Sequence, residues 1–148
     1  MVMKQSHPVS QRILEKMIAL ASCSKLHRIL VAGSKSTELV LELERGGYVH
    51  VAATANCGRP AQQYDVVLVD WRRRTLGALE TTLNWLTDCL RPEGVLVVWA
   101  DPQKPAAREN LRRALESRGL VIEAASVRED GSAISARRRD VKPIRQAA

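Results

Sequence analysis

Three short apolar runs constrain the fold of this chain more than any other feature of its sequence. They are ILVA at residues 29–32, VVLV at 66–69 and VLVVWA at 95–100. Because aliphatic residues follow one another without alternating polar ones, each run is typical of a strand covered on both faces. The segments between the runs have the periodicity of amphipathic helices. Strands that alternate with helices predict an α/β protein with a mostly parallel sheet and right-handed crossovers.

The expected elements follow from this pattern and from the turn residues between the runs. We predict helices at about 8–22, 38–45, 75–90 and 102–118, and strands at 28–32, 48–53, 65–70, 95–100, 120–128 and 133–139. The strand at 65–70 should be central, because it is apolar on both faces. An irregular loop over residues 54–63 should leave the strand at 48–53 at a sheet edge. The last two strands flank Asp130-Gly131, which predicts an antiparallel hairpin.

Length and charge set the domain organisation and the class of partner. A chain of 148 residues, 45% of them hydrophobic, is expected to form one domain, with a basic tail at about 140–148. Its formal net charge of +7 indicates an acidic partner, although much of the excess lies in two arginine runs, 72–74 and 137–139. With two Tyr, three Trp and no Phe, the chain offers no aromatic platform for stacking bases.

The cysteines and the apolar runs indicate the compartment. Cys23, Cys57 and Cys89 are odd in number and share no ligand spacing, so we expect neither a disulfide framework nor a metal site. No apolar run approaches the roughly 20 residues that cross a bilayer, and residues 1–7 lack a signal-peptide pattern. The chain is therefore expected to be cytoplasmic, with reduced thiols and no contact with a membrane.

The turn after the first strand is the expected ligand site. Its sequence is GSKST at residues 33–37, in which Gly33 allows a tight turn and Ser36 or Thr37 can cap the following helix. Free amides and the positive end of the helix dipole would then face the mouth of the turn, where α/β proteins bind ligands. Lys35 is within reach of an anion bound there, and Asp70 ends the central strand at the same edge of the sheet.

Four segments, in this order, resemble the class I S-adenosylmethionine-dependent methyltransferases. They are ILVAGS, YDVVLVD, LRPEGVLVVW and LRRALESRGLVIEAASVRED, which together cover residues 28 to about 139. The resemblance is to a degenerate or minimal member. It implies a Rossmann-like sheet with helices on both faces and a C-terminal β-hairpin, S-adenosylmethionine as cofactor and an unknown methyl acceptor. It also implies which residues border the cofactor crevice: Gly33, Ser34, Lys35, Asp70 and Trp71.

The departures from the family pattern concern the cofactor. Val31 stands where that family carries an acidic residue, and Lys35 and Thr37 stand where it carries further glycines. A side chain at those positions obstructs the approach of a ligand to the backbone. Residues 48–55 contain no carboxylate for the ribose hydroxyls, and residues 54–63 are too few for the helix, strand and helix that the family places there. We therefore expect weak or absent binding of the cofactor.

Two functions fit these residues. One is a methyltransferase-like protein with weak or lost activity; the other is a non-catalytic module for a protein or RNA partner, like the degenerate halves of some ribosomal RNA guanine methyltransferases. A homo-oligomer is compatible with both. A degenerate response-regulator receiver is a weaker alternative, because Ala32-Gly33 supplies no acidic pair for magnesium. A phosphate-binding P-loop would need adjacent Gly and Lys, which Ser34 separates here. No catalytic base can be named from the sequence.

Overall fold

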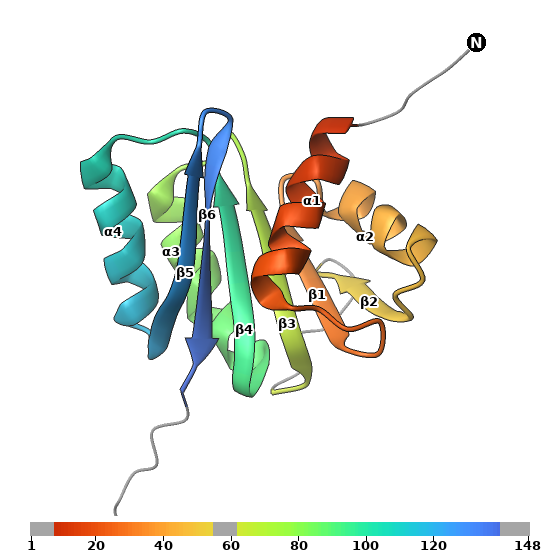
Figure 1. The fold of residues 1–148 in the computed structure, drawn as a ribbon. Coiled ribbons are helices and arrows are strands. Elements are labelled where there is room, and N and C mark those ends of the chain that lie inside the picture. Colours follow the sequence, from red (N-terminus) through yellow and green to blue (C-terminus); the bar gives the residue numbers. More distant parts are fainter. Residues whose placement is uncertain (1–7, 55–61, 140–148) are drawn as a thin grey trace, which may run out of the picture.

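The computed structural model describes residues 8–54 and 62–139, which form one six-stranded sheet between two layers of helices (Figure 1). The order of the strands is β2-β1-β3-β4-β6-β5, with β1 to β4 parallel and β6 antiparallel to both β4 and β5. In chain order the elements are α1 (Pro8–Ala21), β1 (Arg28–Gly33), α2 (Ser36–Arg45), β2 (His50–Ala53), β3 (Tyr64–Trp71), α3 (Leu76–Cys89), β4 (Leu90–Ala100), α4 (Pro105–Glu116), β5 (Leu120–Arg128) and β6 (Gly131–Arg138).

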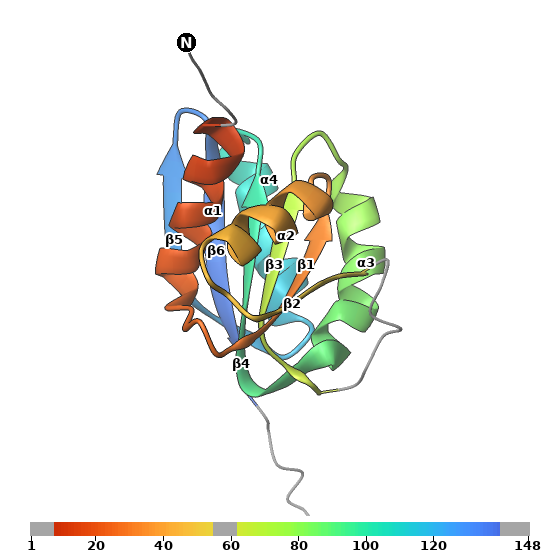
Figure 2. The same ribbon diagram turned by 90° about the vertical axis from the view of Figure 1, so that its right-hand side faces the viewer.

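This architecture confirms the α/β fold with helices on both faces and a C-terminal hairpin. Helices α1 and α2 cover one face of the sheet, and α3 and α4 cover the other (Figure 2). Strand β3 lies inside the sheet, as its apolar run predicted, and β2 lies at the edge, as predicted for the strand at 48–53. Most of the loop predicted over 54–63 lies outside the described residues. None of the described helices is both long and apolar enough to cross a bilayer.

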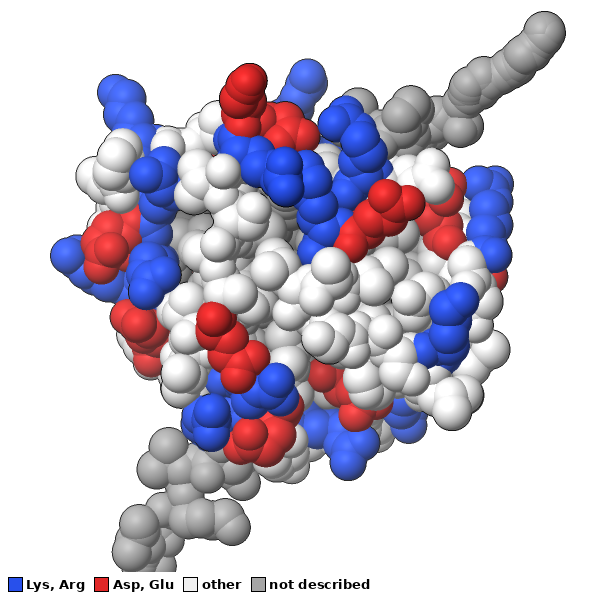
Figure 3. Space-filling model, viewed as in Figure 1, with Lys and Arg blue, Asp and Glu red and all other residues white. Residues whose placement is uncertain are grey.

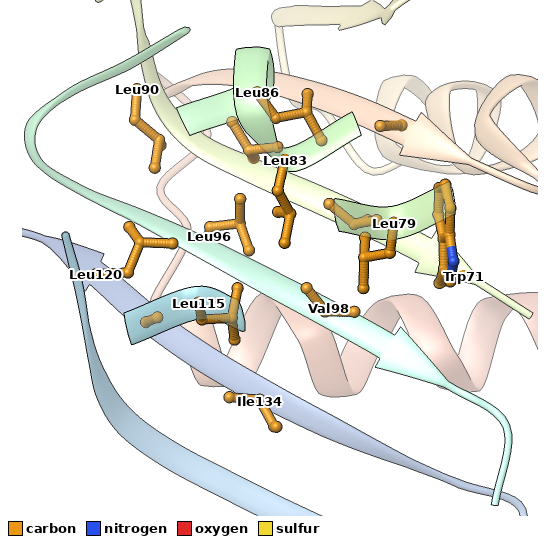
Figure 4. Close-up of a cluster of buried hydrophobic side chains, with 14 of the residues drawn as sticks. Trp71, Leu79, Leu83, Leu86, Leu90, Leu96, Val98, Leu115, Leu120 and Ile134 are labelled. Atoms are coloured by element: carbon orange, nitrogen blue, oxygen red, sulfur yellow. The ribbon is translucent and has the colours of Figure 1, made fainter. Parts of the chain in front are cut away.

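The helices pack on the sheet through side chains spaced three and four residues apart. In α3, Leu79, Leu83 and Leu86 are at most 1% exposed and lie over Leu96 and Val98 of β4 (Figure 4). Burial of one such side chain stabilises the fold by about 1.5–3 kcal/mol. A second cluster, on the opposite face, joins α1 and α2 to β1, β3 and β4. Both faces of the central strands are thus buried, which explains their unbroken apolar sequence.

Several helix boundaries differ from the prediction by one to three residues, and two of these differences have a clear cause. The helix expected to extend to Leu90 ends at Cys89, because Leu90 pairs with Tyr64 and begins β4. The helical spacing of leucines continues through this position, since an apolar side chain is buried equally well at the first residue of the strand. Helix α4 begins at Pro105 and not at Pro102, with a proline at its first position, where no amide donor is needed.

Charged side chains lie around the rim of the face shown in Figure 3. Basic and acidic residues are mixed along its upper, lower and left edges, and the middle of the face is largely uncharged. The upper edge is the one at which the parallel strands β3 and β4 end (Figure 1). In an open α/β sheet this carboxyl edge is where ligands bind.

Candidate functional site

Gly33 ends β1 beside Asp70, the second-last residue of β3. Its φ angle is 105°, which side chains rarely allow, and a Cβ atom here would overlap the backbone carbonyl of Asp70. Only glycine therefore fits at this position. The close approach of the neighbouring strand is sufficient to require it.

Ser34 ties the turn to the residues that follow β3. Its amide donates to the carbonyl oxygen of Asp70 at 2.7 Å, and its hydroxyl donates to the carbonyl oxygen of Arg72 at 2.6 Å. The same hydroxyl oxygen accepts from Nε of Arg74 at 3.1 Å. The amide and the hydroxyl of Ser34 are thus both engaged within the protein.

The start of α2 differs from the prediction that Ser36 or Thr37 caps it. The N-cap residue is Lys35, with no side-chain hydrogen bond to the helix, and Ser36 is already the first helical residue. The bonds of Ser34 to β3 and beyond fix the chain so that the helix begins before either hydroxyl can cap it: Ser36 lies one residue and Thr37 two residues past the N-cap. Lysine has no acceptor atom for a cap. Its Nζ lies 3.6 Å from a carboxylate oxygen of Glu38 instead.

Asp70 is fully buried and paired with Arg72. Nε of Arg72 donates to Oδ1 of Asp70 at 2.8 Å, and the side chain of Arg72 is 17% exposed. The hydrogen bond to Asp70 raises the pKa of Arg72, against the opposing effect of burial. A buried carboxylate requires such a partner, because an unpaired charge in the interior is costly. The Asp70 carboxylate is therefore neutralised from within the chain.

Trp71 belongs to the core more than to the site. It is 4% exposed, packs with the side chains between α3 and the sheet, and donates from Nε1 to the carbonyl oxygen of Thr75 at 2.7 Å (Figure 4). The guanidinium of Arg74 lies over its ring, 5.1 Å from the centroid. The tryptophan thus positions an arginine at the carboxyl edge while its own polar atom is satisfied.

A pocket of about 310 Å³ opens at this edge, lined by Ser34, Lys35, Arg72 and Arg73. Five residues were predicted from the sequence to border the site. Two of them, Ser34 and Lys35, line this pocket. The other three, Gly33, Asp70 and Trp71, do not line it.

Sequence reasoning missed Arg72 and Arg73, because a run of three arginines is usually only solvated. Their position directly after the central strand was the signal that could have found them, since it places them at the carboxyl edge. Arg73 has a φ of 62°, and its amide donates to Oδ2 of Asp101, the residue that follows β4.

No set of metal ligands accompanies this pocket. Within 8–54 and 62–139, no three His, Cys, Asp or Glu side chains lie together as a metal site would require. Cys23 is a free thiol, and Cys57 lies outside the described residues. The chemistry available at the pocket is that of hydrogen-bond donors and positive charge.

The overall structure is similar to those of several S-adenosylmethionine-dependent methyltransferases, although no family model and no curated protein matches the sequence. A ribosomal protein L11 methylase from Lactobacillus delbrueckii subsp. bulgaricus has a TM-score of 0.68 at 12% identity, over 93% of this chain and 91% of that one. The 1,6-didemethyltoxoflavin-N1-methyltransferase of Burkholderia thailandensis, solved with S-adenosylhomocysteine, has a TM-score of 0.62 at 14% identity, over 90% and 79%. An O-methyltransferase from Thermotoga maritima scores 0.62 at 12% identity, over 95% and 69%.

Proposed function

We propose that this chain, which has a class I methyltransferase-like fold, binds S-adenosylmethionine weakly or not at all and acts as a non-catalytic module for a partner. The observation that carries the proposal is the closure of the turn after β1 by the residues at the end of β3. The fold itself does not decide the matter, because function depends on the site that a fold carries.

One backbone donor of the turn, the amide of Ser34, is already engaged. The amide of Ser34 is bonded to Asp70 at 2.7 Å, so a ligand could use it only by breaking that bond. Leaving the Asp70 carbonyl without a donor would cost about 1–3 kcal/mol, which the ligand would have to offset. Strand β2, with the sequence HVAA, carries no carboxylate to hold a ribose.

The carboxylate at the end of the central strand is also occupied. The side chain of Asp70 is 0% exposed and that of Arg72 is 17% exposed, so a ligand could reach the carboxylate only by displacing side chains such as Arg72. Separating a buried pair of this kind costs about 3–5 kcal/mol. These two costs together exceed what a small number of new hydrogen bonds would return, at about 0.5–1.5 kcal/mol each.

One observation favours a second candidate, a weakly active methyltransferase. The pocket of about 310 Å³ lies at the carboxyl edge of the sheet, where this class of fold binds its ligand. If a cofactor bound there, methyl transfer would need little more than correct positioning of donor and acceptor. Binding of the cofactor therefore separates the two candidates.

The test is calorimetric titration of the full-length protein with S-adenosylmethionine and S-adenosylhomocysteine. We expect no saturable heat at millimolar cofactor, and a sub-micromolar dissociation constant would contradict the proposal. A Lys35→Gly variant restores a glycine of the family pattern without touching the bonds of Ser34. We expect it to remain inactive in binding. If it gained the cofactor, the lysine side chain and not the closed turn would be the obstacle.

A further inference from the structure

We propose that the pocket lined by Ser34, Lys35, Arg72 and Arg73 binds a phosphate group, carried by a small phosphate ester or by the backbone of RNA. This proposal rests on the proposed function, because it requires that S-adenosylmethionine does not occupy the pocket.

The positive charges at this pocket are only partly neutralised. Arg72 is paired with Asp70, and Lys35 lies 3.6 Å from Glu38. Arg73 forms no ion pair within the described part of the chain, and the same is true of Arg74. The cationic side chains here are those of Lys35, Arg72, Arg73 and Arg74, and the carboxylates that face them are those of Glu38, Asp70 and Asp101. A bound anion would neutralise the remaining positive charge.

Neither Arg73 nor Arg74 has a carboxylate partner for its guanidinium within the described residues, and the two are held differently. Arg73 adopts a left-handed conformation, held by the bond from its amide to Asp101. Arg74 uses its Nε to reach the hydroxyl of Ser34 and stacks on Trp71. No described group accepts from the terminal NH₂ groups of Arg74. The guanidinium of Arg74 is therefore already oriented and loses little freedom when a ligand binds.

The chemistry of these donors selects phosphate. A guanidinium presents paired N–H groups that match the oxygens of phosphate, and hydrogen bonds between two charged groups are the strong ones. A pocket of about 310 Å³ lies at the lower end of the range for small-molecule sites, which suits a phosphate with part of its ester group.

The pocket at the opposite edge of the sheet shows that arginines alone do not make such a site. It has a volume of about 350 Å³ and is lined in part by Arg91 and Arg137. Arg91 lies 2.8 Å from a carboxylate oxygen of Asp65, and Arg137 lies 2.7 Å from one of Glu123. Both guanidiniums are thus neutralised, and they leave no unpaired positive charge in this pocket for an anion to bind.

The experiment follows the backbone amides of the full-length protein by NMR at constant ionic strength. The probes are inorganic phosphate, adenosine monophosphate and a ten-residue uridine RNA. We expect saturable shifts at residues 33–37 and 72–74, and a loss of affinity of about tenfold in Arg73→Gly. Glycine adopts the left-handed conformation freely, so this variant removes the guanidinium without straining the turn. Arg113→Ala, on the exposed side of α4, removes one charge elsewhere and should change affinity by less than about twofold.

The outcomes are distinct. Shifts that saturate with phosphate or the nucleotide alone support a site for free phosphate esters, and tighter binding of RNA at the same amides supports its backbone as the source. Failure of all three probes to move these amides more than others overturns the inference, as does equal weakening by Arg113→Ala. Tight binding of S-adenosylmethionine would refute the proposed function while leaving a phosphate result intact.

Discussion

Replacing Gly33 with alanine tests whether the turn after β1 is closed by β3. The added Cβ would overlap the backbone carbonyl of Asp70, which cannot rotate away as a side chain could, and the residue would keep a φ of 105°. The backbone strain costs about 1–3 kcal/mol and the overpacking costs a similar amount. We therefore expect a loss of about 2–6 kcal/mol, a large part of the 5–15 kcal/mol that stabilises a typical domain.

The assay is urea denaturation followed by circular dichroism, with thermal unfolding as a second measurement. The expected loss corresponds to a fall in Tm of roughly 5–20 °C for a chain of this size. Gly119→Ala is the matched control, because Gly119 has a φ of 83° but no atom within 4 Å of an added Cβ. Its loss of stability should come from the backbone strain alone. If Gly33→Ala were no less stable than Gly119→Ala, close contact with β3 would not explain the glycine.

Three further predictions concern charged and thiol groups. Arg72→Ala should destabilise the fold by about 3–5 kcal/mol in urea denaturation, because it leaves the buried carboxylate of Asp70 without its partner; a loss below 1 kcal/mol would contradict this. The hydrogen bond from Arg137 lowers the pKa of Glu123, so their pair stabilises the fold above the ordinary pKa of a glutamate and is lost as the pH falls. Glu123→Gln should accordingly show a smaller drop in Tm between pH 5 and pH 3 than the wild type, and an equal drop would refute the assignment. Burial raises the pKa of the Cys23 thiol to about 12, so iodoacetamide at pH 8 should label it, by peptide mapping, only in urea; rapid labelling of the native protein would be the contrary result.

Most of the fold could be predicted from the sequence because its signals are local. The run VVLV at 66–69 identified the central strand, and the spacing of Leu79, Leu83 and Leu86 identified the helix that packs on it. The end of that helix could not be predicted, because Leu90 suits a helix and a strand equally. Its pairing with Tyr64, 26 positions earlier in the chain, decides between them.

The site was less predictable, since its contacts join distant parts of the chain. Gly33 was placed correctly at the turn, but the reason for the glycine is a carbonyl group 37 positions away. The bonds of Ser34 to Asp70 and Arg72 also join residues that are far apart in the chain. They fix the start of α2, so that neither Ser36 nor Thr37 caps it. Local patterns locate such a turn but do not reveal which of its groups are already engaged.

The contact between Gly33 and β3 has a consequence for comparing this chain with its homologues. Replacement of the glycine is opposed by strand packing alone, so we expect it to persist in descendants of this chain whether or not they use a cofactor. Positions 35 and 37, where Lys35 and Thr37 stand, carry no such packing constraint, because they lie beyond the strand. Among homologues, the residues at positions 35 and 37 should therefore vary with ligand binding. The glycine should be retained wherever the two strands pack in this way.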